Sequence, residues 1–110
     1  MAKYERKLIG DFDDIIKKIE DGILAESVSA SLEDESHFRG KDSRCAILVF
    51  ERYSAFGGNR VSLSVTLFES EGEIRVSGIT SGGSQAVFMK LNTLGEETFL
   101  ETFKKTVDSI

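Results

Sequence analysis

Two segments of the chain repeat their hydrophobic residues at helical spacing. The first carries five apolar residues that recur mostly three or four positions apart: Phe12, Ile15, Ile16, Ile19 and Ile23. Asp11 precedes them and suits the N-cap, while Gly22 suits the left-handed residue that ends many helices. The pattern therefore predicts an amphipathic helix over residues 11–21.

The second helical segment closes the chain. Its apolar residues are Phe99, Leu100, Phe103, Val107 and Ile110. Thr93 and Glu96 have the spacing of a capping box, which places the start of the helix near Gly95 and its end near Ser109. Residues 86–91 fit either a short sixth strand or the first turn of this helix.

Between the helices the hydrophobic period changes to two, which is typical of strands with one solvated face. We expect a strand over residues 25–32, a polar hairpin tip over residues 33–41, and a central strand over residues 45–53. The clearest alternation runs from Val61 to Leu67, and a further strand follows over residues 74–79. Residues 3–9 can form an opening strand.

These elements predict one α+β domain over residues 1–110, in the order strand, helix, four or five strands, helix. The chain has no proline, so its turns depend on Gly, Asn, Asp and Ser. Short turns between consecutive strands favour an antiparallel meander, and its apolar face requires both helices on that side.

Charge and composition exclude several classes of protein. The net charge is -5, whereas nucleic-acid and anionic-membrane surfaces need clustered Lys and Arg, so we expect neither partner. The single cysteine cannot form an internal disulfide, and the longest apolar run, six residues from Cys45 to Phe50, is too short to span a bilayer. We therefore expect a cytoplasmic protein.

Four motifs carry a resemblance to a known family: ERYS at 51–54, GGNRVSL at 57–63, TSGGSQA at 80–86 and NTLGEE at 92–97. With them the chain resembles a family of small bacterial proteins of unknown function, about 110 residues long, along nearly its whole length. That resemblance implies no activity, cofactor or catalytic residue. The element order is similar to TATA-binding-protein-like (TBP-like) and helix-grip folds, although this chain lacks a basic, aromatic-rich sheet face.

Individual reactive side chains give little indication of catalysis. Cys45 lies in the apolar strand with Ile47 and Val49, and we expect it to be a packed core thiol. His37 is the single histidine and lies close to Glu35 in an acidic stretch that we interpret as solvated charge, without a metal. No Gly-x-Ser-x-Gly motif or cofactor motif occurs.

The direction of the strands suggests one candidate site. Alternate turns of a meander share an end, so the loops at 54–59 and 81–85 are expected together, opposite an acidic end with Glu33, Asp34, Glu35, Glu69, Glu71 and Glu73. We call the first the glycine-loop end. Its candidate ligand-binding residues are Arg52, Gly57, Gly58, Asn59, Arg60, Ser81, Gly82, Gly83, Ser84 and Gln85. Glycine amides can form an anion-binding nest beside arginine, although in a chain without proline these glycines are better explained as turns.

The sequence therefore favours a non-catalytic domain that binds a small, anionic ligand or a protein. One alternative is a homodimeric assembly domain that pairs through a strand edge or through its Ser/Thr face. Another is an enzyme that holds an anionic substrate with Arg52 or Arg60.

Overall fold

The computed structural model describes residues 1–53, 60–82 and 89–110. The elements follow in the order β1 (Ala2–Leu8), α1 (Phe12–Glu26), β2 (Ser31–Arg39), β3 (Ser43–Tyr53), β4 (Arg60–Ser70), β5 (Glu73–Gly82) and α2 (Met89–Asp108). The predicted α+β class is confirmed. Residues 89–91 belong to α2, and residues 86–88 lie outside the described part.

One antiparallel sheet contains the five strands in the order β1-β5-β4-β3-β2. Strands β2 to β5 form the predicted meander, and β1 returns to pair with β5 at the far edge. The middle strand is therefore β4, which runs between β5 and β3. Every second residue of β4 is buried, from Val61 to Leu67.

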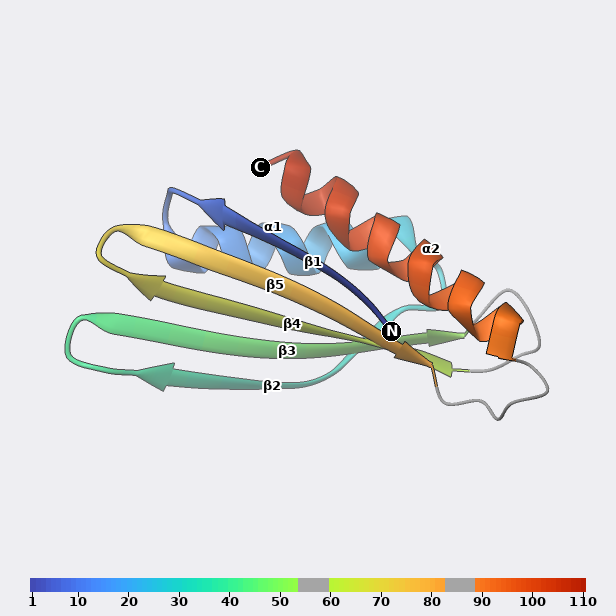
Figure 1. Cartoon of the computed structure of the whole chain (residues 1–110). Coiled ribbons are helices and arrows are strands. Elements are labelled where there is room, and N and C mark those ends of the chain that lie inside the picture. The colour runs from blue at the N-terminus through green and yellow to red at the C-terminus, as the bar shows by residue number, and fades with distance from the viewer. Residues whose placement is uncertain (54–59, 83–88) are drawn as a thin grey trace.

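Both helices lie on the same side of the sheet (Figure 1). Ile19 and Ile23 of α1 and Phe99 and Phe103 of α2 are fully buried and join the inward residues of the strands in one hydrophobic core. Gly78 of β5 lies directly under Phe103, where an added Cβ would overlap the aromatic ring. A glycine at this position lets α2 pack close to the sheet.

Helix α1 begins as predicted and ends later. The Asp11 carboxylate accepts a hydrogen bond from the Asp14 amide at 2.9 Å, which confirms the N-cap. The predicted stop at Gly22 is wrong, since the helix continues to Glu26. Gly22 instead packs tightly against α2, because a Cβ there would lie 2.5 Å from the Thr106 Cγ2 atom.

The predicted strand over residues 25–32 and the predicted tip over 33–41 are wrong for most of their length: only residues 31–32 belong to a strand and only residues 40–41 to the turn. Val28 is fully exposed in the turn after α1, and β2 covers Ser31–Arg39 instead. Strand β2 pairs with β3 on one side only, so backbone pairing holds it in the sheet while most of its side chains remain exposed. Such a strand lacks the apolar alternation by which a strand is predicted.

Helix α2 begins six residues before the predicted start, at Met89. The proposed capping box is therefore inside the helix. Glu96 accepts a hydrogen bond from the Gly82 amide at 2.8 Å, so its carboxylate connects α2 to β5. This tertiary contact explains an acidic side chain that the local pattern alone assigned to a cap.

Candidate functional site

The sheet face opposite the helices is the first candidate surface, and we call it the open face. Direct cross-strand partners project from the same side of a sheet. One row of such partners crosses all five strands through Lys7, Arg75, Phe68, Cys45 and Phe38. A second row passes through Lys3, Ile79, Ser64, Val49 and Asp34. No described element covers this face in Figure 1.

Apolar side chains occupy much of the open face. We call them the apolar patch: Phe38, Cys45, Ile47, Val49, Phe68 and Ile79. Phe38 is 62% exposed, Phe68 43% and Ile79 40%, and the three residues from β3 are half-buried. Exposed apolar surface that is continuous across strands is typical of a binding surface.

Hydroxyl and charged groups surround the apolar patch. Ser62, Ser64 and Thr66 of β4 lie on the open face, which confirms the predicted solvated face of that strand. On the β1 and β5 side the charged residues are Lys3, Glu5, Lys7, Glu73 and Arg75. On the β2 and β3 side the open face carries the acidic Asp34 and Glu51. The two edges therefore differ in charge.

An open hollow of about 460 Å³ lies where β1, β5 and β4 meet. Most of its lining comes from residues of the open face, including Glu5, Lys7, Thr66, Phe68 and Arg75. The lining combines an aromatic residue with three cationic residues and a carboxylate. Such a mixture suits contact with another protein surface.

The antiparallel register brings the described borders of the glycine-loop end together. Tyr53 pairs with Arg60 and Val61 pairs with Gly82, so β3, β4 and β5 reach this end side by side. Ser81 and Gly82 belong to β5. The other candidates, Gly57, Gly58, Asn59, Gly83, Ser84 and Gln85, lie outside the described residues.

The two candidate arginines point to opposite faces of the sheet. Arg60 pairs across strands with Tyr53 on the open face, and its Nη2 atom lies 2.5 Å from Glu51 Oε1 and 3.8 Å from Glu33 Oε2. Arg52 pairs with the buried Val61, so it projects toward the helices, where its Cζ atom lies 4.5 Å from the centre of the Phe99 ring. The structure therefore does not direct the two guanidinium groups toward one ligand.

Of the two arginines, Arg52 is the one whose guanidinium group has a buried nitrogen, the Nε atom, without a hydrogen-bond partner among the described residues. Burial lowers the pKa of the guanidinium from its ordinary value, because desolvation disfavours the charged form. The π face of the Phe99 ring stabilises this cation by a cation–π interaction.

The described amide of the predicted anion nest already binds an anion from the same chain. Glu96 is 7% exposed, and its carboxylate accepts the Gly82 amide hydrogen bond at 2.8 Å and pairs with the Met1 ammonium group. Sequence analysis missed this contact because Glu96 lies where a helix cap was expected. A carboxylate at the start of the apolar α2 stripe was the available signal.

Cys45 is not in the core, contrary to prediction. The buried residues of β3 are Ala46, Leu48 and Phe50, which places Cys45 on the open face between its cross-strand partners Phe38 and Phe68. Its thiol is free and half-buried. The direct cross-strand neighbours of the thiol are therefore two aromatic residues.

His37 projects toward the helix side of β2, because its cross-strand partner is the buried Ala46. Its Nε2 atom lies 2.7 Å from Glu35 Oε1, and both side chains are exposed. The imidazole is thus on the other side of the sheet from the Cys45 thiol. The fold does not assemble a cysteine–histidine pair from them.

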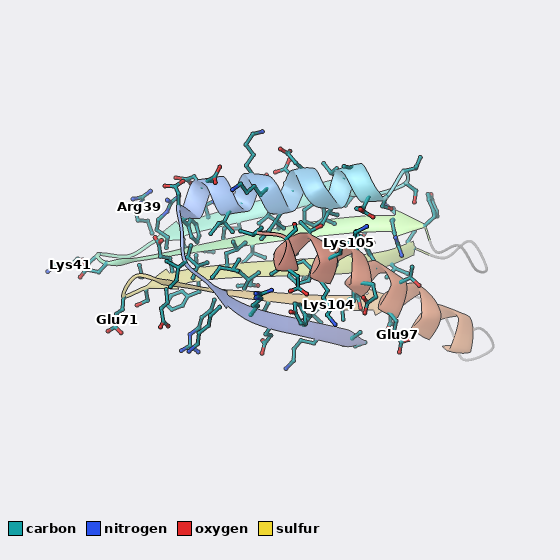
Figure 2. All side chains as sticks on the ribbon, turned by 90° about the horizontal axis from the view of Figure 1, so that it is seen from above. Arg39, Lys41, Glu71, Glu97, Lys104 and Lys105 are labelled. Atoms are coloured by element: carbon teal, nitrogen blue, oxygen red, sulfur yellow. The ribbon has the colours of Figure 1, made fainter. Side chains whose placement is uncertain are left out.

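The predicted acidic end is wrong in two respects. Glu33 lies near Arg60 at the glycine-loop end, because Ser31 pairs with Glu51 and so β2 begins there. The far end also carries basic side chains, as Figure 2 shows for Arg39 and Lys41 near the same end as Glu71. The charge of that end is therefore mixed.

The chain belongs to DUF6054, a family of unknown function, whose family model matches residues 1–110. This confirms the resemblance to an uncharacterised family of this length. No curated protein and no solved structure matches the chain. Within the described residues, no helix is both long and apolar enough to cross a membrane.

Proposed function

We propose that the protein is a non-catalytic protein-interaction domain that binds its partner through the open face. The observation that carries this proposal is the apolar patch, in which Phe38, Phe68 and Ile79 are exposed on a sheet face that no described helix covers. Antiparallel sheets tolerate solvent on one face when that face is polar. Three large exposed apolar side chains on such a face indicate that a partner covers them.

The open face favours a protein partner over a small ligand. Its apolar residues are spread over four strands, from Phe38 on β2 to Ile79 on β5. Small-molecule sites are instead concave and enclose most of their ligand. A broad surface with an apolar centre and a charged border has the anatomy of a protein interface.

Site-specific photo-crosslinking in the cells that produce the protein tests this proposal. A photoreactive amino acid replaces Thr66, at the middle of the open face, or Leu24, which is 37% exposed on α1. We expect protein adducts from position 66 and few from position 24, whether the captured protein is a second copy or another chain. Absence of adducts at 66, or equal yields at both positions, would contradict the proposal.

A small-anion site is the second candidate function, and the unpartnered Nε atom of Arg52 favours it. Titration with phosphate, nucleotides and small carboxylates, followed by backbone amide shifts of Arg52, Arg60 and Gly82, tests this candidate. Binding predicts shifts that disappear in Arg52→Met, which keeps the apolar contact with Phe99. Unchanged shifts at millimolar ligand would exclude it.

The order strand, helix, four strands, helix supports our assignment of a TBP-like topology. We keep that assignment as part of the proposal. The bacterial source and the cytoplasmic location that the sequence suggests also remain part of it. None of these points is needed for the interaction surface, which depends on the register of the sheet and on the exposure of its open face.

A further inference from the structure

We infer that the partner of the open face is a second copy of this chain, packed face to face about a two-fold axis parallel to β4. This inference rests on the proposed function and names its partner. A two-fold axis makes the same surface serve both copies, so the surface must be complementary to itself. The rows of residues across the open face show how this complementarity arises.

The sheet has the symmetry that such an axis needs. Strand β4 is the third of the five strands, with two strands on either side. Rotation about an axis along β4 therefore places β4 over β4, β5 over the partner's β3, and β1 over the partner's β2. Aligned sheet packing of this kind keeps the strand directions of two sheets within about 30° of one another.

Charge selects this axis over the alternatives. In the row Lys3–Ile79–Ser64–Val49–Asp34, rotation about β4 brings Lys3 to the partner's Asp34 and Ile79 to the partner's Val49. Lys3 and Asp34 are both exposed, and the flexible stem of lysine tolerates the crossing of the strands. A two-fold axis perpendicular to the strands would instead place β2 over the partner's β2. No basic residue of the open face would then lie opposite Asp34.

The aromatic row fits the same axis. In the row Lys7–Arg75–Phe68–Cys45–Phe38, Phe68 lies on the central strand and therefore meets the partner's Phe68. Phe38 comes under the aliphatic stem of the partner's Lys7, which can cover the ring while its ammonium group stays in water. Aromatic residues at the centre of an interface, surrounded by a charged border, often contribute most of the binding energy.

The face is large enough for a stable dimer. Five strands spaced about 4.8 Å apart, each about 25 to 35 Å long, give a face of about 600 to 800 Å². Standard interfaces bury about 800 Å² per partner. The open face therefore offers the area of a standard interface without any contribution from the helices.

Charge reversal tests the inference by sedimentation at several concentrations. Lys3→Glu alone places a second carboxylate opposite the partner's Asp34 twice in each dimer, and Asp34→Lys alone places a second ammonium group opposite Lys3. We expect each variant to weaken dimerisation about tenfold, because two attractive pairs become repulsive. An equimolar mixture of the two variants allows a heterodimer in which one pair is restored with reversed sign and the other keeps its native sign. That mixture should regain the wild-type dissociation constant.

Recovery of dimerisation in the mixture cannot come from a contact between Lys3 and Asp34 within one chain. Lys3 and Asp34 lie on opposite edge strands, four strand spacings or about 19 Å apart. Lys41→Glu at the β2–β3 turn is the matched control and should leave dimerisation unchanged. Failure of the mixture to recover, with circular dichroism showing all variants folded, would overturn the inference.

Cysteine crosslinking tests the axis itself in a Cys45→Ser background. Ser70 at the end of β4 lies near the axis, so two Ser70→Cys residues should be about 10 Å apart across the sheets and within reach of a short bismaleimide. Two Ser36→Cys residues on the edge strand should be about 20 Å apart and should not react with each other. The opposite pattern of crosslinks would overturn the proposed axis.

The two proposals fail differently. A chain that stays monomeric at all concentrations, while position 66 still forms adducts with another protein, contradicts the second copy and leaves the interaction domain intact. A monomeric chain with no adducts from the open face contradicts both.

Discussion

Glu96 connects helix α2 both to strand β5 and to the first residue of the chain. Its buried carboxylate accepts the Gly82 amide hydrogen bond and pairs with the Met1 ammonium group. Glu97, its exposed neighbour, has the same helix propensity. We expect Glu96→Ala to lower the free energy of unfolding by about 2 kcal/mol, because the partly buried Gly82 amide loses a charged acceptor.

The control for this prediction is Glu97→Ala, which should change stability by less than about 0.5 kcal/mol. Urea denaturation of both variants measures the difference. Equal effects from the two substitutions would show that the contacts of Glu96 with Gly82 and Met1 are not stabilising.

Asp108 gives the residue-scale prediction for pH. Its carboxylate accepts hydrogen bonds from the Tyr4 hydroxyl at 2.7 Å and from Arg6 Nη1 at 2.5 Å. The Tyr4 hydrogen bond and then Arg6 hold the pKa of this carboxyl below its ordinary value. A lowered folded-state pKa stabilises the fold above the unfolded value of about 3.9, and that stabilisation is lost as the pH falls through the folded pKa.

Asp108→Asn should therefore destabilise the protein at neutral pH and lose that difference from wild type in strong acid. Denaturation at neutral pH and again at a pH below the lowered folded-state pKa of Asp108 measures it. A penalty that stays constant across this range would mean that the Asp108 charge does not contribute.

At the scale of elements, the crossing of α1 and α2 depends on Gly22. Alanine inside a free helix is about 1 kcal/mol more favourable than glycine. A Cβ at position 22 would nevertheless lie 2.5 Å from Thr106 Cγ2 and 2.9 Å from its Oγ1 atom. Overpacking of this kind costs about 1–3 kcal/mol, so we expect Gly22→Ala to be destabilising on balance.

A Thr106→Ala background should reverse the sign of that effect. The nearest remaining Thr106 atom would be Cβ at 3.3 Å, which a small shift of the helix can accommodate. Gly22→Ala should then be neutral or stabilising, as measured by urea denaturation. Stabilisation in both backgrounds would contradict the close packing of the two helices.

The same elements show why sequence analysis predicted the fold better than the element boundaries. Strand β4 and the core face of α1 were predictable because their apolar residues keep one period throughout. Strand β2 was missed because pairing on one side holds it in place, which leaves no apolar alternation in the sequence. Gly22 was mistaken for a stop because glycine serves both helix ends and close helix contacts, and only the position of Thr106 distinguishes them.

At the scale of the whole molecule, the candidate surface could be predicted only in part. The Ser/Thr side of β4 was visible as alternation, but Phe38 lies in a polar stretch and Phe68 follows Leu67, which interrupts the pattern. Their position together on either side of Cys45 depends on the register of three strands. Register is a tertiary property, so residues far apart in sequence formed a patch that no local pattern indicated.

The proposed dimer makes a prediction about the stability of the molecule as a whole. When only the folded state associates, its apparent stability rises with protein concentration. The thermal midpoint of the wild type should therefore increase over a hundredfold range of concentration. Phe68→Ser should remove most of this increase, because Phe68 lies on the proposed axis and is lost from both copies at once.

Phe68→Ser should have little effect on the isolated monomer, since Phe68 is 43% exposed and lies outside the core. At low concentration the variant and the wild type should therefore unfold at nearly the same temperature. Leu24→Ser, at a comparable 37% exposure on α1, should retain the wild-type concentration dependence. A loss of stability that is the same at every concentration would assign Phe68 to the fold of the monomer and remove the aromatic centre of the proposed interface.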